Sequence, residues 1–242
     1  EEEEEEEEED DAAERERRDI DVLVPTEAFE ASIHALEVAG WTREGDAWWM
    51  KRSRSRYEVP LARQVGGVRV ECDLHRRLLL YRHLPIHPSE LVARAAPIAG
   101  TAYLLPDAHD LFLHTALHAM MTGYQVPLRT WLDLHRLIVE GQVALMRLAQ
   151  RARDWHAETA LWVALRTLAR LWGHTFPPEL MRPLAPPALF RFGLERLFKG
   201  EGATPLTARV PDETARVAAK TMVLGSRRPH RWVREHLALR LG

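Results

Sequence analysis

The sequence predicts an α+β fold in which a small mixed-sheet core is followed by an α-helical domain. Two observations support this prediction. β-Rich runs flank one helical pattern in the first third of the chain, and apolar residues recur every three to four positions after about residue 85. A length of 242 residues suits one large domain or two small ones. We expect a leader at residues 1–11, the core at 12–84 and the helical domain at 85–242.

The leader consists of nine Glu and two Asp residues. Like charges repel and no apolar side chain is available to bury, so we expect this segment to be disordered and dispensable for folding. The remaining residues hold all 33 basic side chains against 25 of the 36 acidic ones, a net charge of +8. Most of these bases are Arg, which favours phosphate-bearing ligands; the base composition of the gene is an equally good explanation.

The first elements of the core are a strand and a helix. Residues 19–24 form a β-rich run that ends at Pro25. Thr26 is in position to cap the next helix, and Gly40 is in position to end it. The apolar residues of that helix are Phe29, Ile33, Leu36 and Val38.

Three further strands complete the predicted core. Residues 47–51 and 57–61 flank a basic turn, and residues 68–74 alternate after a Gly66-Gly67 turn. The turn, with Arg52, Arg54 and Arg56 near Trp48, suits either a polyanion or a solvated hairpin tip. The core therefore reads strand–helix–strand–strand–strand.

The rest of the chain predicts helices. They are expected at residues 104–121, 128–139, 143–153, 158–172, 188–199 and 212–224. The Trp residues in these helices are expected in the core. No Gly- or Ser-rich linker precedes this part, so we expect it to pack against the core.

Composition excludes several classes of protein. The longest apolar runs are far shorter than the roughly 20 residues of a membrane span, and the acidic start does not resemble a secretory signal. Cys72 is the only cysteine, so an internal disulfide and a Cys-based zinc cluster are excluded. We therefore expect a cytoplasmic protein without a membrane partner.

Three carboxylates are the main candidates for chemistry. Asp19 and Asp21 are two apart on a strand and thus share one face, and Asp73 ends a later strand. Together they would form a cage for two divalent cations, Mg²⁺ or Mn²⁺, of the kind that supports phosphoryl or nucleotidyl transfer. The alternative is a pair of strand-end Asp residues, because an Asp-x-Asp motif is common by chance.

Four segments of the chain together resemble a known family. They are RDIDVLV at 18–24, VECDLH at 70–75, and the helical segments at 105–118 and 128–137. They resemble the uncharacterised nucleotidyltransferase-like proteins of the polymerase-β superfamily, over about residues 17–175. The resemblance implies that Asp19 and Asp21 are metal ligands, and that Asp73 orients or deprotonates an acceptor hydroxyl. It also implies an NTP substrate whose nucleoside monophosphate moves to an acceptor that the sequence does not identify.

One departure from this family leaves a second hypothesis open. Active members carry a Gly-Ser or Gly-Gly turn that holds the triphosphate, whereas residues 12–18 contain neither Gly nor Ser. Arg17 and Arg18 are the candidates to hold the phosphates instead. The alternative is a catalytically degenerate core that binds a nucleotide or a partner without turnover.

Histidines supply a weaker alternative. His109-Asp110 resembles the metal-binding doublet of HD-type phosphohydrolases, with His83 or His87 upstream and Asp133 downstream. His114 and His118 share a helix face at a spacing that suits zinc, although a structural pair is the more common use of this spacing. The acceptor, the base preference, a nucleic-acid partner and the oligomeric state stay open.

Overall fold

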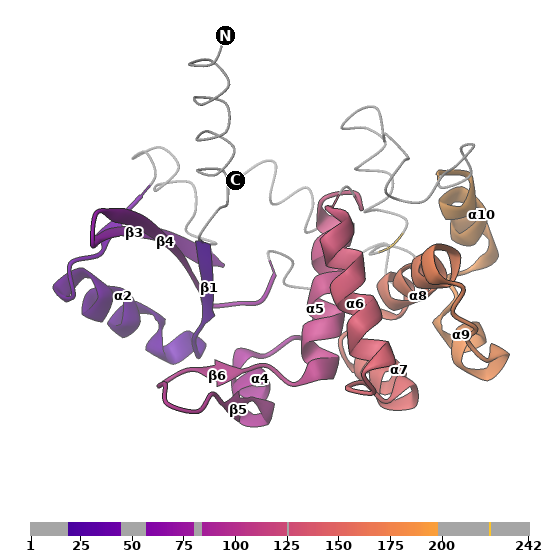
Figure 1. The fold of residues 1–242 in the computed structure, drawn as a ribbon. Coiled ribbons are helices and arrows are strands. Elements are labelled where there is room, and N and C mark those ends of the chain that lie inside the picture. Colours follow the sequence, from indigo (N-terminus) through magenta and orange to yellow (C-terminus); the bar gives the residue numbers. More distant parts are fainter. Residues whose placement is uncertain (1–18, 45–56, 80–83, 125, 198–222, 224–242) are drawn as a thin grey trace, which may run out of the picture. The chain divides into compact units, whose positions relative to one another are not determined.

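A computed structural model describes residues 19–44, 57–79, 84–124, 126–197 and 223 (Figure 1). The chain divides into two compact units. The core unit comprises residues 1–80 and 87–92, and the helical unit comprises residues 81–86 and 93–242. The four-stranded sheet lies in the first unit and the helices from residue 108 to residue 197 lie in the second, which confirms the predicted α+β class. The predicted boundary at residue 84 stays a prediction.

The core unit contains a mixed sheet with strand order β1-β4-β3-β2. β1 (Asp19–Leu23) runs parallel to β4 (Val68–His75). β4 is antiparallel to β3 (Glu58–Val65), which pairs in turn with the short β2 (Thr42–Arg43). The strand expected at residues 47–51 and the basic turn after it lie outside the described residues.

The β3–β4 hairpin turns through the predicted Gly66-Gly67 pair. Val65 pairs with Val68, and the glycines have φ values of 61° and 83°. A two-residue turn with positive φ at both positions matches the right-handed twist of the flanking strands. This turn sets the register of the whole hairpin, including the pairing of Glu58 with His75.

The helix α2 (Phe29–Val38) follows a 3₁₀ turn at Thr26–Ala28 and ends before Gly40, whose φ is 88°. Thr26 does not cap this helix, so that prediction is wrong. The 3₁₀ turn moves the N-cap position from Thr26 to Ala28, and the Thr26 hydroxyl donates instead to the Arg76 carbonyl at 3.2 Å.

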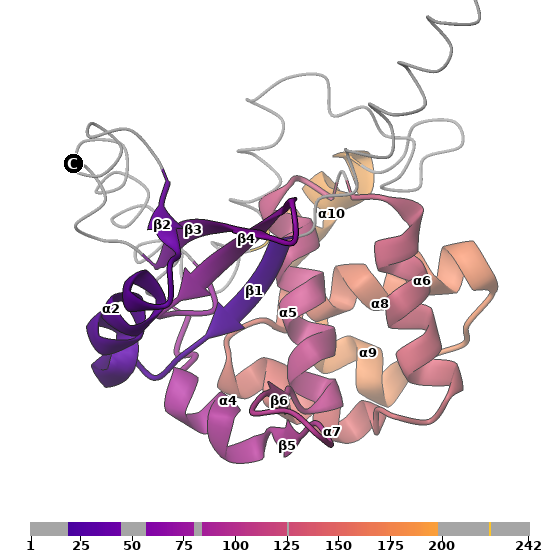
Figure 2. The ribbon, with the colours of Figure 1, turned by 60° about the vertical axis from the view of Figure 1, so that its left-hand side comes forward.

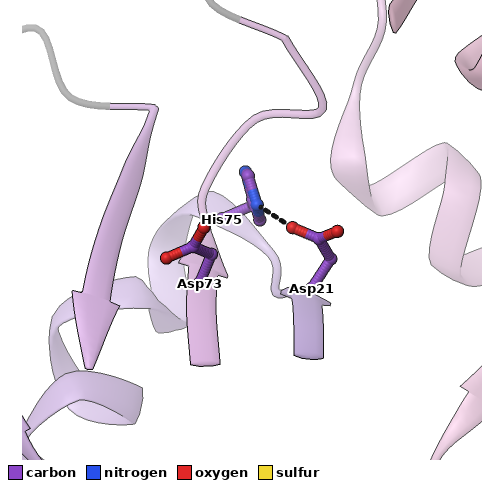
Figure 3. Close-up of side chains that lie close together, drawn as sticks. All are labelled: Asp21, Asp73 and His75. Carbon is purple, nitrogen blue, oxygen red and sulfur yellow. Dashed lines mark hydrogen bonds and ion pairs between the residues drawn. The ribbon is translucent and has the colours of Figure 1, made fainter. Parts of the chain in front are cut away.

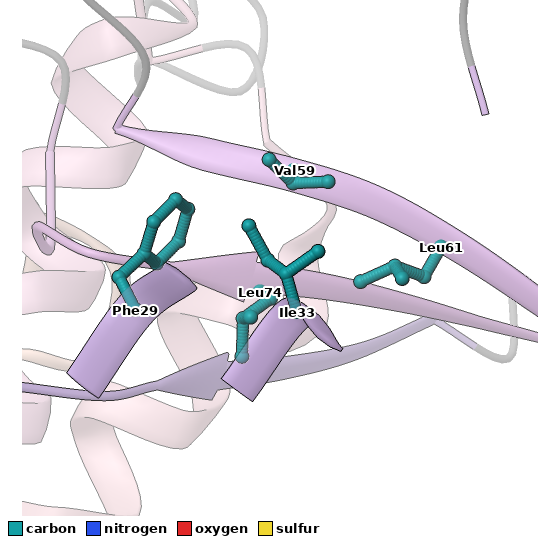
Figure 4. Close-up of a cluster of buried hydrophobic side chains, with 5 residues drawn as sticks. All are labelled: Phe29, Ile33, Val59, Leu61 and Leu74. Atoms are coloured by element: carbon teal, nitrogen blue, oxygen red, sulfur yellow. The ribbon is translucent and has the colours of Figure 1, made fainter. Parts of the chain in front are cut away.

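One face of the sheet packs on α2. The cluster consists of side chains that are at most 3% exposed, namely Phe29, Ile33, Val59, Leu61 and Leu74 (Figure 4). Successive strand residues point to opposite faces, so burial of Leu74 directs its neighbours Asp73 and His75 to the other face. The hydrophobic core thus determines which face of the sheet is polar.

Residues 84–107 hold three short elements that the sequence pattern did not indicate: α4 (Pro88–Arg94), β5 (Ala96–Pro97) and β6 (Leu104–Leu105). The prediction that a helix begins at residue 104 is wrong. Pro106 follows β6, and a residue before proline is disfavoured in helical conformation. The helix begins at Ala108 instead, capped by Asp107, whose side chain accepts the His109 N–H at 3.0 Å.

The helical unit consists of packed helices of seven to fifteen residues. They are α5 (Ala108–Met121), α6 (Leu128–Val139), α7 (Leu145–Asp154), α8 (Glu158–Trp172), α9 (Pro178–Leu184) and α10 (Ala188–Leu197). α5 lies against α6, α7 and α8 (Figure 2). Trp131, Trp155 and Trp162 are buried, as predicted, whereas Trp172, also expected in the core, is only half-buried.

Of the predicted helices, α6 and α8 have the expected bounds. The helix expected at residues 212–224 lies outside the described residues, except for Val223. Within the described part of the chain, no helix has both the length and the apolar character that a membrane span requires.

Candidate metal centre

β1 and β4 bring two of the predicted carboxylates side by side. Asp21 and Asp73 are direct partners in the parallel ladder, so their side chains emerge next to each other on the same face (Figure 3). That face is the one opposite α2. The central part of the predicted site therefore forms because two strands distant in sequence pair in this register.

The other predicted site residues are described less fully. Asp19 lies in β1 opposite Glu71 of β4, two residues before Asp21, and only its backbone is described. Arg17 and Arg18 lie outside the described residues. Their assignment as metal and phosphate ligands stays a prediction.

His75 joins the two carboxylates, a role the sequence patterns did not indicate. One ligand atom each from Asp21, Asp73 and His75 lie within 4.8 Å of one another. Figure 3 shows the imidazole of His75 beside both carboxylates. His75 could have been predicted from alternation along the strand, because it lies two residues after Asp73 and therefore on the same face, as Asp21 does relative to Asp19.

The two ring nitrogens of His75 face two carboxylates. Nε2 lies 2.8 Å from Oδ1 of Asp21, and Nδ1 lies 3.5 Å from Oε2 of Glu58. Nδ1 is buried, and the described residues offer it no hydrogen bond. The Asp21 side chain is 70% exposed, whereas those of His75 and Glu58 are 15% and 21% exposed. The centre is thus open to solvent at Asp21 and closed at Glu58.

The carboxylates perturb the groups around them. Burial raises the pKa of Glu58, and the charges of Asp73 and Asp21 raise it further. Burial and the same two charges raise the pKa of Cys72 to about 11. The pKa of Tyr57 is raised by burial first and then by Glu58, with which it forms a hydrogen bond. The negative potential at this face of the sheet attracts cations.

This donor set fits a divalent metal ion. Carboxylate oxygens are the ligands of Mg²⁺ and Mn²⁺, and imidazole nitrogen is a ligand of transition ions. The orientation of His75 also fits such an ion. A metal-bound histidine donates its other N–H to a carboxylate or carbonyl, and the buried Nδ1 faces the Glu58 carboxylate. Among the described residues, these three form the one group of three ligands that meet closely enough for a metal.

The HD-type alternative does not fit the structure. His109 Nε2 accepts the backbone N–H of Ala144 at 3.1 Å, and Nδ1 lies 3.0 Å from Asp107. The side chain of Asp110 is 1% exposed and pairs with Arg94 and Arg151. Both residues of the doublet are used in structural contacts, which leaves no ligand atoms directed at a metal. His83 lies outside the described residues.

The His114–His118 pair does not form a zinc centre in the described part of the chain. The two rings are 6.2 Å apart and tilted by 48° on α5. They belong to no group of three close metal-ligating side chains among the described residues. The pair is therefore consistent with the structural role that its spacing more often indicates.

Comparison with known proteins gives one finding. A family model described as uncharacterised nucleotidyltransferase matches residues 9–173, a span that includes β1, β4 and the helices to α8. Comparison with the curated proteins finds no match, and neither does comparison with the solved structures.

Proposed function

The chain belongs to the family of uncharacterised nucleotidyltransferases, and we propose that it moves a nucleoside monophosphate from an NTP to an acceptor in a metal-dependent reaction. The single observation that carries the proposal is the pairing of Asp21 with Asp73, with His75 beside them. Two adjacent carboxylates, of which Asp21 is largely exposed, suit the binding of a metal–triphosphate complex. Mg²⁺ and Mn²⁺ are the candidate ions.

The carboxylates have distinct roles in this proposal. Asp19 and Asp21 would hold the metal, and Asp73 would complete the cage. A bound divalent ion supplies charge neutralisation at the phosphates and at the departing pyrophosphate. Arg17 and Arg18 contact the phosphate oxygens.

Asp73 also activates the acceptor. Its carboxylate accepts the proton of the acceptor hydroxyl while the hydroxyl oxygen bonds to the α-phosphorus. The bond from the α-phosphorus to the bridging oxygen breaks, and pyrophosphate leaves with that electron pair. The Asp21 side chain is 70% exposed, so substrates can reach this side of the centre from solvent.

Transfer of label from an NTP tests this function. The protein is incubated with α-phosphate-labelled NTPs, Mg²⁺ or Mn²⁺, and a desalted cell extract as the source of acceptors. We expect label on an acceptor, and at least about 100-fold less with Asp21→Asn or Asp73→Asn, because each removes charge from the reacting phosphates. Glu37→Gln is the matched control, since Glu37 pairs with Arg43 on the surface of the same unit. Unchanged transfer by Asp21→Asn would overturn the proposal.

The degenerate binding protein is the second candidate, favoured by the absence of Gly and Ser from residues 12–18. It predicts NTP binding that depends on metal and on Asp21, with neither label transfer nor pyrophosphate release. The same incubation separates the two, provided that NTP is supplied at millimolar concentration.

A further inference from the structure

We infer that the ion at this centre is a divalent transition metal bound through His75, and that Glu58 positions the histidine, so that the centre selects Mn²⁺ over Mg²⁺. This inference rests on the metal centre of the proposed function and specifies its ion. Asp21 and Asp73 alone would suit either ion, because both ions accept carboxylate oxygen. The distinguishing ligand is the imidazole.

The first step is that the Nε2 atom of His75 points toward the Asp21 carboxylate. Nε2 lies 2.8 Å from Asp21 Oδ1, and one ligand atom each of Asp21, Asp73 and His75 lie within 4.8 Å of one another. An ion bound between the two carboxylates therefore meets a nitrogen donor. Mg²⁺ prefers oxygen ligands and retains its waters, whereas first-row transition ions accept imidazole.

The second step concerns the proton of His75. Nε2 contacts Asp21, and the buried Nδ1 faces Glu58. With an ion on Nε2, the proton of the imidazole would lie on Nδ1, and Glu58 Oε2, 3.5 Å from Nδ1, would be its acceptor. The result is a carboxylate–histidine–metal arrangement, in which the outer carboxylate fixes the tautomer.

The third step is that Glu58 is already held in place. Glu58 lies directly opposite His75 in the β3–β4 ladder, and the Glu58 carboxylate forms a hydrogen bond with the Tyr57 side chain. The rings of Tyr57 and His75 lie 5.7 Å apart, which confines the imidazole on that side. Glu58 is therefore a positioning residue that acts on the ion through His75.

Binding of Mn²⁺ to the full chain tests the inference without an activity assay. Electron paramagnetic resonance gives the dissociation constant of Mn²⁺, and competition gives that of Mg²⁺. Electron spin-echo modulation detects a histidine nitrogen bound to Mn²⁺, and ¹⁵N-histidine labelling changes that modulation with no mutation. We expect this change in the wild type and its loss in Asp21→Asn.

Three variants complete the design. His75→Gln offers an oxygen in place of the nitrogen, and we expect the dissociation constant of Mn²⁺ to rise about tenfold or more and that of Mg²⁺ to change little. Glu58→Gln removes the outer charge, and we expect about tenfold weaker Mn²⁺ binding with the nitrogen signal retained. Glu37→Gln is the control and leaves both constants unchanged.

The outcomes separate this inference from the proposed function. Two results would overturn the inference and leave the carboxylate centre supported. One is Mn²⁺ binding that depends on Asp21 but shows no nitrogen modulation. The other is the same preference for Mn²⁺ over Mg²⁺ in the wild type and in His75→Gln. Metal binding that is unaffected by both Asp21→Asn and Asp73→Asn overturns the centre itself. If His75→Gln fails to fold, the isotope experiment on the wild type still decides.

Discussion

At the residue scale, aspartate has different roles in the two units, as a candidate metal ligand at Asp21 and as a buried ion-pair partner at Asp110. The Asp21 carboxylate is 70% exposed and borders a group of ligands, whereas that of Asp110 is 1% exposed and pairs with two Arg residues. Exposed carboxylates next to each other invite a cation, while a buried one with paired guanidinium groups is structural. This difference depends on tertiary contacts with Arg94 and Arg151, which the sequence pattern does not reveal. The pair His109-Asp110 therefore resembled a metal-binding doublet in sequence.

Asp110→Asn is expected to lower stability and leave the metal centre intact. The substitution leaves Arg94 and Arg151 without their charged partner in a mostly buried place, a loss of about 3 kcal/mol. Thermal unfolding measures this loss, and Mn²⁺ binding checks the centre. Asp133→Asn on the exposed face of α6 is the control and changes stability by less than about 0.5 kcal/mol. A stable Asp110→Asn protein that has lost Mn²⁺ binding would revive the phosphohydrolase hypothesis.

The contact between His135 and His174 predicts a loss of stability in acid. Their ring nitrogens are 2.8 Å apart, and burial, then the charge of His135, lowers the pKa of His174 from its ordinary 6.5. The folded state therefore binds fewer protons than the unfolded state. The stabilisation is complete above pH 6.5 and is lost as the pH falls below that value.

Melting temperatures between pH 7.5 and 5.5 test this loss. We expect the wild type to lose more over this range than His174→Gln, which has no proton to gain at this position. Parallel pH profiles for the two proteins would contradict the assignment.

Alternation along a strand predicted that Asp19 and Asp21 share one face, because the period of two is dictated by backbone geometry, and Asp73 was predicted from its place at the end of a later strand. The same alternation from Asp73 would have indicated His75, whereas the significance of Glu58 depends on the pairing of β3 with β4. The Gly66-Gly67 turn contains that information, since it fixes Val65 opposite Val68 and hence Glu58 opposite His75. What no local pattern supplies is the parallel pairing of β1 with β4, which joins segments some fifty residues apart.

At the element scale, the hairpin that holds Glu58 and His75 depends on its turn. Gly67 has a φ of 83°, and a Cβ built there meets no atom within 4 Å. The cost of Gly67→Val is thus conformational, about 1–2 kcal/mol, because a β-branched residue disfavours positive φ. Gly66→Asn is the matched control, since Asn tolerates this conformation in such turns.

Urea unfolding measures both turn variants. A Gly67→Val protein as stable as the wild type would show that the turn does not have the conformation described. If Gly67→Val loses the expected stability and also binds Mn²⁺ more weakly, the substitution has shifted the pairing of β3 with β4, so that Glu58 no longer lies opposite His75.

Long periodic elements were the easiest to predict. α6 and α8 have the expected bounds because each combines a continuous apolar period with a clear start and end. Shorter elements followed local constraints that compete with periodicity. Pro106 converts the expected first helical turn into β6, and the 3₁₀ turn at Thr26–Ala28 removes Thr26 from its capping position.

At the scale of the whole molecule, charge is divided along the chain. Residues 1–11 hold eleven carboxylates, the rest of the chain has a net charge of +8, and the family match begins only at residue 9. We expect deletion of residues 1–11 to change the melting temperature by no more than a few degrees, on the scale of about 1 kcal/mol. Differential scanning calorimetry of the shortened and full chains measures this. A collapse of soluble yield would show that the leader contributes to folding.

In the proposed centre, Asp21, Asp73 and His75 together bind a metal ion that also contacts an NTP. The most direct measurement is anomalous diffraction at the manganese edge, from crystals grown with Mn²⁺ and a non-hydrolysable NTP analogue. We predict an anomalous peak at about 2.2 Å from carboxylate oxygens of Asp21 and Asp73 and from His75 Nε2, with phosphate oxygens completing its coordination. A manganese peak elsewhere in the molecule, with these three side chains arranged as in Figure 3, would contradict the account.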